Sequence, residues 1–579
     1  MANLATTYDV VEVQRCQELV RYCEVSRDQR RALCDNLRYA YERGTLEGPR
    51  AAVNEILPHI DRVASYLFAP DIIRLGGKLQ RQYAQDWRGA AMAAREIVQQ
   101  SWHDSGTDQV FVLLLEWALV YNSTVAKVMA DPATGWRTGY IEPWDFGVAR
   151  EDIPRLDSQD TMTHYYDLSI PEIERWVKNQ PREDDLLDIA RKHERKLPGQ
   201  IRQGLVVSTI QGIYPGSTVL GGFPGQPDMP GDDGEPMVDE PTVPFVDLWE
   251  RRVFKRKTPW MPKGEEYEDW LVTTMVADGS EIFARRRNPV LPWVRLSKTS
   301  VLEAEHPFVM VTPRPRPRYL WGRSEVAFLL GLQRWILEHY DAMKKGIGKQ
   351  LNPAKFFSGI ADYEEAGAAL DSEGGSYSSA EPGAKMDQVR VQLGAEIFQF
   401  EQLLERKFAD ASGLPKSMSE PGQLPGGVRS EGHFSLAASI GSGRILRMAR
   451  LIEDPLGQIA TKGYHILQRQ DDQKYEREDG PPFLLSQIPP GALAFGVNSH
   501  SASPIFAEQT KQDGYLLHRA KVIRGEDLIE MVNPPNKDEL KAHAREIEKS
   551  QAERSEELLE IQRTKALKGQ GGRVGRPPK

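Results

Sequence analysis

The most informative stretch of the sequence runs from Tyr319 to Pro353 and reads YLWGRSEVAFLLGLQRWILEHYDAMKKGIGKQLNP. Prolines alternate with other residues just before it, in Thr312–Arg318, so a helix is not expected there. Ser324 is a favourable N-cap, and large apolar residues then recur every three or four positions. This spacing predicts a helix over 325–350, about 39 Å long, that ends at Asn352-Pro353.

Two further amphipathic segments follow. Apolar residues at helical spacing, from Ile397 to Phe408, predict a second helix over 396–411 that stops at Ser412-Gly413-Leu414-Pro415. A proline- and glycine-rich loop comes next, at 416–427. A third helix is predicted from Ser430 to about Gln470, with kinks at its glycines and at Pro455.

This order of elements resembles the portal protein of tailed bacteriophages. The likeness rests on the phrase YLWGRSEVAFLLGLQRWILEHYDA and on the helix-SGLP-loop-helix run, and it covers roughly residues 30–470. It implies an α+β, mainly helical fold with a portal-like architecture: a wing, stem helices, a small α/β clip, a tunnel loop, a long kinked helix and a C-terminal helical crown.

The resemblance also implies domain boundaries. The parts expected are a wing (1–320, with a β-rich part at about 245–312 and a flexible insert at 215–244), a first stem helix (321–351), a clip (352–394), a second stem helix (395–414), a tunnel loop (415–429), a kinked helix that returns to the wing (430–500), crown helices (501–568) and a disordered basic tail (569–579).

Several local patterns predict elements within the wing. Charged amphipathic helices are expected over 9–43, with Ser26 or Asp28 as a cap and Gly44 as a stop. Further helices are expected over 50–67, kinked at Pro58, and over 78–102 and 109–129.

The β-rich part of the wing is predicted from alternation. Residues 245–311 alternate between apolar and polar, with a turn at Asp278-Gly279, which favours antiparallel strands. A strand is also expected at 162–166. After it, Ser169 and Glu172 form a capping-box pattern at a helix start.

Composition narrows the class of protein. The chain has 579 residues and a net charge of −9, which argues against a general nucleic-acid coat but suits a channel through which DNA slides without sticking. Its three cysteines, Cys16, Cys23 and Cys34, are expected to be reduced, half-buried helix residues. The sequence does not begin with a charged and then apolar leader, and the most apolar run, 110–120, is too short to span a bilayer, so a soluble intracellular protein is expected.

Motifs that would indicate an enzyme do not occur. The sequence contains no G-x-x-x-x-G-K-[ST], H-E-x-x-H, paired C-x-x-C or G-x-S-x-G. We therefore expect no enzyme activity, no cofactor and no metal, although a spatially assembled site would leave no such motif.

The resemblance predicts a portal ring of twelve copies at one capsid vertex, the channel for genome packaging and ejection. Its partners would be the major capsid protein, the terminase large subunit, head-completion and tail adaptor proteins, a scaffold protein and double-stranded DNA, with no membrane contact. It would be found in the virion, and in the host cytoplasm during assembly. The alternative is a non-viral cytosolic scaffold or adaptor protein without a DNA channel.

Candidate site residues follow from this division of the chain. Channel or tunnel candidates are Lys344, Lys345, Lys349, Lys416, Gln423 and Arg429; tunnel-loop flexibility would come from Gly422, Gly426 and Gly427; clip or terminase-docking candidates are Phe356, Phe357, Tyr363 and Tyr377; and tail DNA contacts would be Arg573 and Arg576. The alternatives left open are a solvated helix face for the lysines, a disordered surface loop for the tunnel loop and a solvated tail.

Overall fold

The computed structural model describes, besides a few isolated positions, residues 9–46, 53–68, 75–79, 87–178, 183–196, 241–258, 261–276, 279–288, 294–296, 302–351, 354–358, 385–389, 394–412, 443–470, 474–477, 480–488, 492–497, 514–520 and 522–532. This part of the chain is α+β and contains more helix than strand.

The helices are α1 (Val10–Glu24), α2 (Arg27–Arg43), α3 (Ile56–Leu67), α4 (Arg88–Asp104), α5 (Thr107–Tyr121), α6 (Ile170–Val177), α7 (Glu183–Lys192), α9 (Glu325–Leu351), α11 (Ala395–Ser412), α14 (Gly443–Gln470) and α16 (Gly525–Val532). Two short 3-10 helices are η3 (Leu156–Ser158) and η5 (Leu485–Gln487).

The strands are β1 (Leu75–Leu79), β2 (Thr124–Asp131), β3 (Gly135–Ile141), β4 (Phe146–Val148), β5 (Thr161–Ser169), β6 (Arg195–Lys196), β7 (Pro241–Thr258), β8 (Met261–Val276), β9 (Ile282–Arg287), β10 (Val294–Leu296), β11 (Leu302–Ala304), β12 (Phe308–Val311), β13 (Ala354–Ser358), β14 (Lys385–Val389), β15 (Lys474–Arg477), β16 (Gly480–Leu484) and β17 (Leu493–Val497).

The largest sheet has the order β4-β5-β7-β8-β9, with β6 paired to β7. Its pairings are antiparallel, as alternation in the sequence predicted. Gly279, in the turn between β8 and β9, has φ +72°, and its N–H donates to the Val276 carbonyl over 2.7 Å. The predicted turn is therefore confirmed at Gly279, where a left-handed backbone favours glycine.

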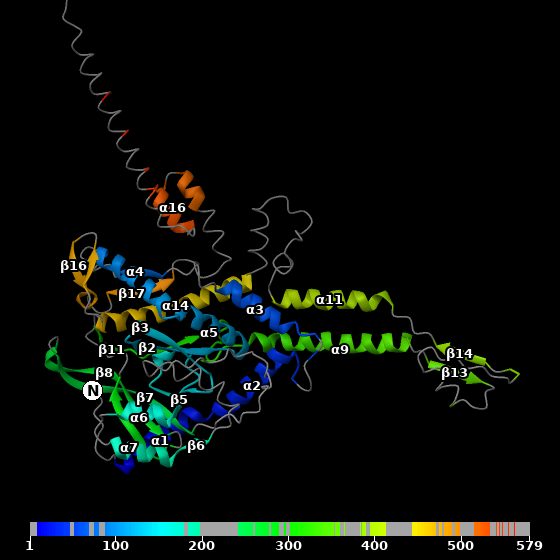
Figure 1. The fold of residues 1–579 in the computed structure, drawn as a ribbon, viewed down its shortest axis with the longest axis horizontal. Coiled ribbons are helices and arrows are strands. Elements are labelled where there is room, and N and C mark those ends of the chain that lie inside the picture. Colours follow the sequence, from blue (N-terminus) through cyan, green and yellow to red (C-terminus); the bar gives the residue numbers. More distant parts are fainter. Residues whose placement is uncertain are drawn as a thin grey trace, which may run out of the picture.

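Helices cover both faces of this sheet. Tyr165 packs with Cys16 and Val20 of α1, whereas Tyr166, the next residue of β5, packs with Ile173 of α6. Because successive strand residues point to opposite faces, α1 covers one face, and α6 with α7 covers the other. Figure 1 shows these helices gathered around the strands at one end of the body.

A second sheet, β12-β2-β3, lies in the main core with α5 and α14. Trp136 of β3 is fully buried, and a Cβ added to Gly463 of α14 would lie 2.4 Å from its indole ring. The glycine thus lets the helix approach the tryptophan closely. Helix α14 is continuous from Gly443 to Gln470, with Pro455 inside it.

Two predicted helices were too long. Helix α5 ends at Tyr121, because Asn122 turns to φ 98° and residues 124–131 form β2, which pairs with both β3 and β12. The segment predicted as helix from residue 78 instead begins in β1, which pairs with β17, and α4 starts only at Arg88. In both places a long-range strand pairing overrides the local pattern.

Predictions about helix ends were partly right. Ser169 and Glu172 form the expected capping box, and Gly44 ends α2 with φ 72°. Ser26 occupies the N-cap position of α2, but its hydroxyl donates to Glu151 over 2.5 Å and makes no cap bond. Pro58 lies in the first turn of α3, where it removes no helical hydrogen bond, so the expected kink was wrong.

Candidate functional site: a two-helix arm and its base

Helix α9 forms one half of an arm that projects from the body (Figure 1). It spans Glu325–Leu351, which confirms the predicted helix, and its 27 residues make it about 40 Å long. Ser324 is the expected N-cap, since its Oγ accepts from the Ala327 N–H over 3.1 Å. The same hydroxyl donates to the Val120 carbonyl over 2.5 Å and so ties the start of the arm to the end of α5.

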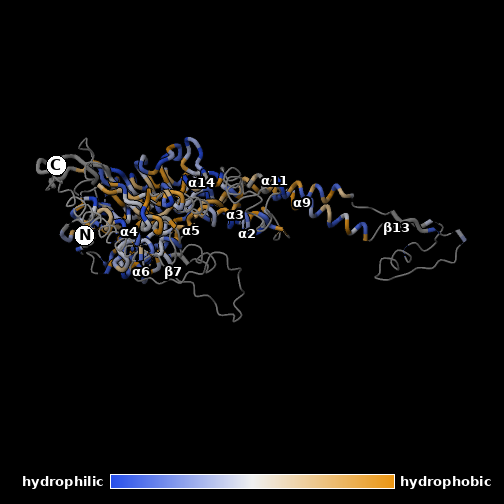
Figure 2. The backbone as a smooth tube through the Cα atoms, turned by 90° about the horizontal axis from the view of Figure 1, so that it is seen from above, coloured by the Kyte–Doolittle hydropathy of each residue, from blue (hydrophilic) through white to orange (hydrophobic). Residues whose placement is uncertain are grey.

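The second half of the arm is α11, which runs beside α9 in the opposite direction (Figure 1), and Figure 2 shows the two helices projecting together from the body. Tyr340 of α9 donates from its hydroxyl to Glu401 Oε1 over 2.8 Å, and the rings of His339 and Phe400 are 5.2 Å apart. At the far end of the arm, β13 and β14 pair antiparallel, with Phe356 opposite Asp387. We call α9, α11, β13 and β14 the arm.

The arm is anchored firmly at its base. Gln333 of α9 is fully buried; its amide donates to the Val53 carbonyl over 2.7 Å, and its Oε1 accepts from the Glu55 N–H over 3.1 Å. Leu329 of α9 and Phe408 of α11 belong to the main core. The proximal part of the arm is therefore a continuation of the body.

The two helices of the arm expose large apolar side chains from the base outward. Trp335 is 58% exposed and Leu351 is 81% exposed. The other exposed large apolar residues of the two helices are Phe328, Ile347, Phe398, Phe400 and Leu403. Such a concentration of exposed apolar surface on one projecting element is typical of an interaction surface.

The predicted lysines lie on the distal half of α9. Lys344, Lys345 and Lys349 are all exposed, and Lys345 Nζ is 2.6 Å from Asp341 Oδ2. The structure places them on one helix near one another, but whether they meet DNA stays a prediction.

The other predicted site residues are less completely placed. Phe356 and Phe357 lie on β13, opposite Asp387 and Met386 of β14. Outside the described residues are the clip residues Tyr363 and Tyr377, the tunnel-loop residues Lys416, Gly422, Gln423, Gly426, Gly427 and Arg429, and the tail residues Arg573 and Arg576.

Sequence reasoning missed a buried ionic cluster at the base of the arm. Glu325, in the first turn of α9, is fully buried and contacts Arg314 and Arg444. Only the arginine-rich segment just before α9 hinted at it. Arg444 is 119 positions away in the sequence, so no local pattern could pair it with Glu325.

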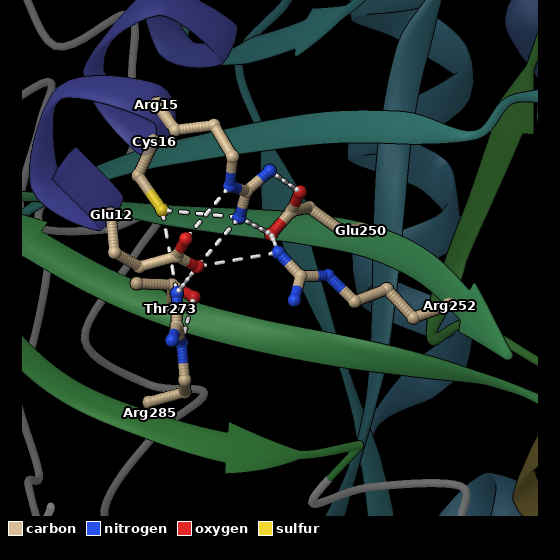
Figure 3. Close-up of polar contacts among 7 residues, drawn as sticks. All are labelled: Glu12, Arg15, Cys16, Glu250, Arg252, Thr273 and Arg285. Atoms are coloured by element: carbon tan, nitrogen blue, oxygen red, sulfur yellow. Dashed lines mark hydrogen bonds and ion pairs between the residues drawn. The ribbon is translucent and has the colours of Figure 1, made fainter. Parts of the chain in front are cut away.

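A second ionic cluster holds α1 on the large sheet (Figure 3). Arg15 Nη1 is 2.6 Å from Glu250 Oε1 of β7, and Glu12 Oε1 is 2.5 Å from Arg285 Nη2 of β9. Arg252 also contacts both carboxylates. Hydrogen bonding from Arg15 is the main cause that lowers the pKa of Glu12 to about 2. Both carboxylates are paired with arginines, and the pairs join α1 to β7 and β9, so the cluster is explained by the docking of α1.

Lys127 and His164 form a buried pair, with Nζ and Nδ1 3.2 Å apart. Burial lowers the pKa of Lys127 to about 8 and holds that of His164 well below its ordinary value. A lysine with such a pKa could serve as a base. Both side chains are enclosed by the sheets, however, so a substrate has no contact with them and we assign them no catalytic role.

Within the described part of the chain, no group of three or more His, Cys, Asp or Glu side chains could hold a metal ion. The three cysteines are buried, free and helical, as expected, although more deeply buried than predicted. None of the described helices combines the length and apolar character needed to cross a membrane. No protein-family model matches the chain, and no curated protein matches its sequence.

Proposed function

We propose that this protein is a portal protein of a tailed bacteriophage. Twelve copies would form a ring at one capsid vertex, through which the genome is packaged and later ejected. The arm would be the stem, its tip strands the clip, and the body the wing. The C-terminal helices would form the crown.

The observation that carries the proposal is the arm itself. A pair of long antiparallel helices leaves the body, carries a small strand pair at its tip, and returns to the main core (Figure 1). This is the order of wing, stem and clip that the sequence resemblance implies. An adaptor protein has no specific need for this arrangement.

The distribution of residues around the arm supports a ring. Phe328, Trp335 and His339 of α9 are spaced by seven and four residues, so they share one side of that helix. The contact between the His339 and Phe400 rings places Phe400 of α11 on the same side. We call Phe328, Trp335, His339 and Phe400 the aromatic flank.

The aromatic flank needs a cover that a single copy does not provide. Phe328, Trp335 and Phe400 are each more than 40% exposed. Charged residues of α9, such as Arg334, Glu338 and Asp341, follow a different side of the helix. A second copy whose arm packs on this flank would bury it, and a head-to-tail contact of that kind closes into a ring if its rotation angle allows.

The remaining roles follow from this arrangement. The tip of the arm would dock the terminase large subunit and later the head-completion and tail adaptor proteins. The body would contact the major capsid protein and, during assembly, a scaffold protein. Lys344, Lys345 and Lys349 would lie near the channel or its mouth, where DNA phosphates pass. The protein itself would catalyse no reaction, and it would reside in the virion after assembly in the host cytoplasm.

The competing function is a cytosolic scaffold or adaptor. It would predict a monomer or dimer and no central channel. Native mass spectrometry together with negative-stain images of one purified sample separates the two. The portal proposal predicts a species of about 785 kDa, twelve times 65.4 kDa, and rings with a central hole. A monomer or dimer that persists at high concentration and with scaffold protein present would refute it.

A further inference from the structure

One carboxylate at the base of the arm is contacted by basic side chains from three other segments. Glu325 Oε2 is 2.8 Å from Arg314 Nη1, and Glu325 Oε1 is 2.5 Å from Arg444 Nη2. His59 Nε2 of α3 lies 3.7 Å from Oε1. Each carboxylate oxygen therefore has its own arginine, and the position of Glu325 is defined from several directions.

Arg444 extends this contact to the second helix of the arm. Its Nη2 binds Glu325 at the start of α9, while its Nη1 donates to the carbonyl of Ala411 in the last turn of α11. Arg444 itself lies in the first turn of α14. A single guanidinium thus joins the beginning of α9, the end of α11 and the beginning of α14.

An aromatic ring supports the same arginines from the side. The guanidinium carbons of Arg314 and Arg444 lie 4.9 and 4.5 Å from the centroid of Phe328, one turn further along α9. Arginine suits this place because its planar, permanently charged group can stack and form several directed hydrogen bonds at once.

The environment keeps Glu325 charged. Burial alone would raise its pKa, but His59, Arg444 and Arg314 together hold the pKa below 4.5. The carboxylate is fully buried, and the side chains of Arg314 and Arg444 are only 20% and 25% exposed. If the carboxylate lost its charge, two largely buried guanidinium groups would lack their counter-ion, so a rearrangement of the junction would follow.

We propose that the Glu325–Arg444 pair is a clamp that sets the angle of the arm relative to the body. Glu325 is a positioning residue in this proposal, because it acts through Arg444 on α11 and α14. The polar contacts of Ser324 and Gln333 hold α9 alone to the body, and α11 meets the main core through apolar side chains such as Phe408, so Arg444 is the polar link between the two helices at the base that these contacts do not supply. The clamp is a property of the single chain and does not depend on the portal proposal.

The length of the arm makes the clamp measurable. Over about 40 Å, a change of about 10° in the angle moves the tip by about 7 Å. Spin labels can be placed at Lys349→Cys, near the end of α9, and at Met92→Cys, on the exposed side of α4. Pulsed electron resonance would then report the distance between the distal part of the arm and the body. The natural cysteines are buried and carry raised pKa values, so they should label slowly.

The test compares single and double variants in labelled protein diluted with unlabelled protein, so that distances within one chain dominate. Glu325→Gln and Arg444→Gln should each broaden the distance distribution, by about 7 Å for each 10° of added swing. The double variant should be no broader than the broader of the two single variants, because the Glu325–Arg444 contact is already lost in each of them. Glu338→Gln, which removes an exposed ion pair with Arg334 on the same helix, should change nothing.

Two results would overturn the clamp. One is an unchanged distribution in Glu325→Gln while circular dichroism shows a folded protein. The other is additive broadening in the double variant, which would mean that the two residues act separately. If Glu325→Gln does not fold, Arg444→Lys provides the test instead. Lysine keeps the positive charge but cannot reach both Glu325 and Ala411. An unchanged distance distribution in Arg444→Lys would also reject the proposal.

Discussion

Replacing Trp335 by serine should weaken assembly without unfolding the subunit. Trp335 is 58% exposed in the single chain, so a neighbouring copy could cover about 145 Å² of a side chain of about 250 Å². At about 25 cal/mol per Å², this burial contributes at most about 3.6 kcal/mol to each contact between copies, because ordering costs at an interface reduce the gain. The affinity of each contact should therefore fall by up to a few hundred-fold.

The assay is sedimentation velocity over a range of protein concentrations. Wild-type protein should form the large species at concentrations where Trp335→Ser remains small, and the circular dichroism of the two should agree. Tyr22→Ser is the matched control, because Tyr22 is 60% exposed but lies on α1, away from the arm. If Trp335→Ser assembles at the same concentration as the wild type, the aromatic flank is not the contact between copies.

Three further predictions concern the body. Gly463→Ala would place a methyl group against the indole of Trp136, so we expect a lower urea midpoint and a loss of about 1–3 kcal/mol, more than the gain in helix propensity. Burial raises the pKa of Asp145 from 3.8 to about 7, despite Arg27 at 3.5 Å. The folded state therefore binds the proton more tightly than the unfolded state, so stability should fall as pH rises between about 4 and 7. Asp145→Asn should flatten that fall in thermal melts. The pKa of Glu12 is lowered to about 2, so its stabilisation is present above pH 4.5 and lost toward pH 2. The protection of α1 amides against hydrogen exchange, taken relative to the intrinsic exchange rate at each pH, should fall in that range. Glu12→Gln should show lower protection already at neutral pH. Unchanged values in any of these variants would contradict the corresponding contact.

The arm was the part of the fold most accessible from sequence. Helix α9 was predicted over 325–350 and spans Glu325–Leu351, because its apolar spacing, its serine cap and the terminal Asn352-Pro353 all agree. Helix α11 was predicted over 396–411 and spans Ala395–Ser412 for the same reason. Both helices carry their signal locally, so distant parts of the chain were not needed.

The errors arose where distant strands decide the outcome. Residues 124–131 continue an apolar helical pattern, yet they form β2 because β3 and β12 supply hydrogen-bond partners on both sides. Residues 75–79 pair with β17, more than 400 positions later in the chain. A single sequence does not reveal such partners, since a short apolar run fits either state.

The ionic contacts at the site were also beyond sequence reasoning. Glu325 was noticed only as part of a helix, and its partners Arg314 and Arg444 come from separate segments. The exposed lysines of α9 were predicted as channel residues from the resemblance alone. Their exposure on the arm is compatible with a channel and equally with a solvated helix face.

A three-dimensional electron microscopy reconstruction of the assembled protein tests the central claim most directly. We predict a closed ring whose arms stand side by side around an axial channel, with Trp335 covered by the arm of the neighbouring copy. Arms that point away from the axis, or a closed dimer in which the arms pair without leaving a channel, would contradict the proposed function.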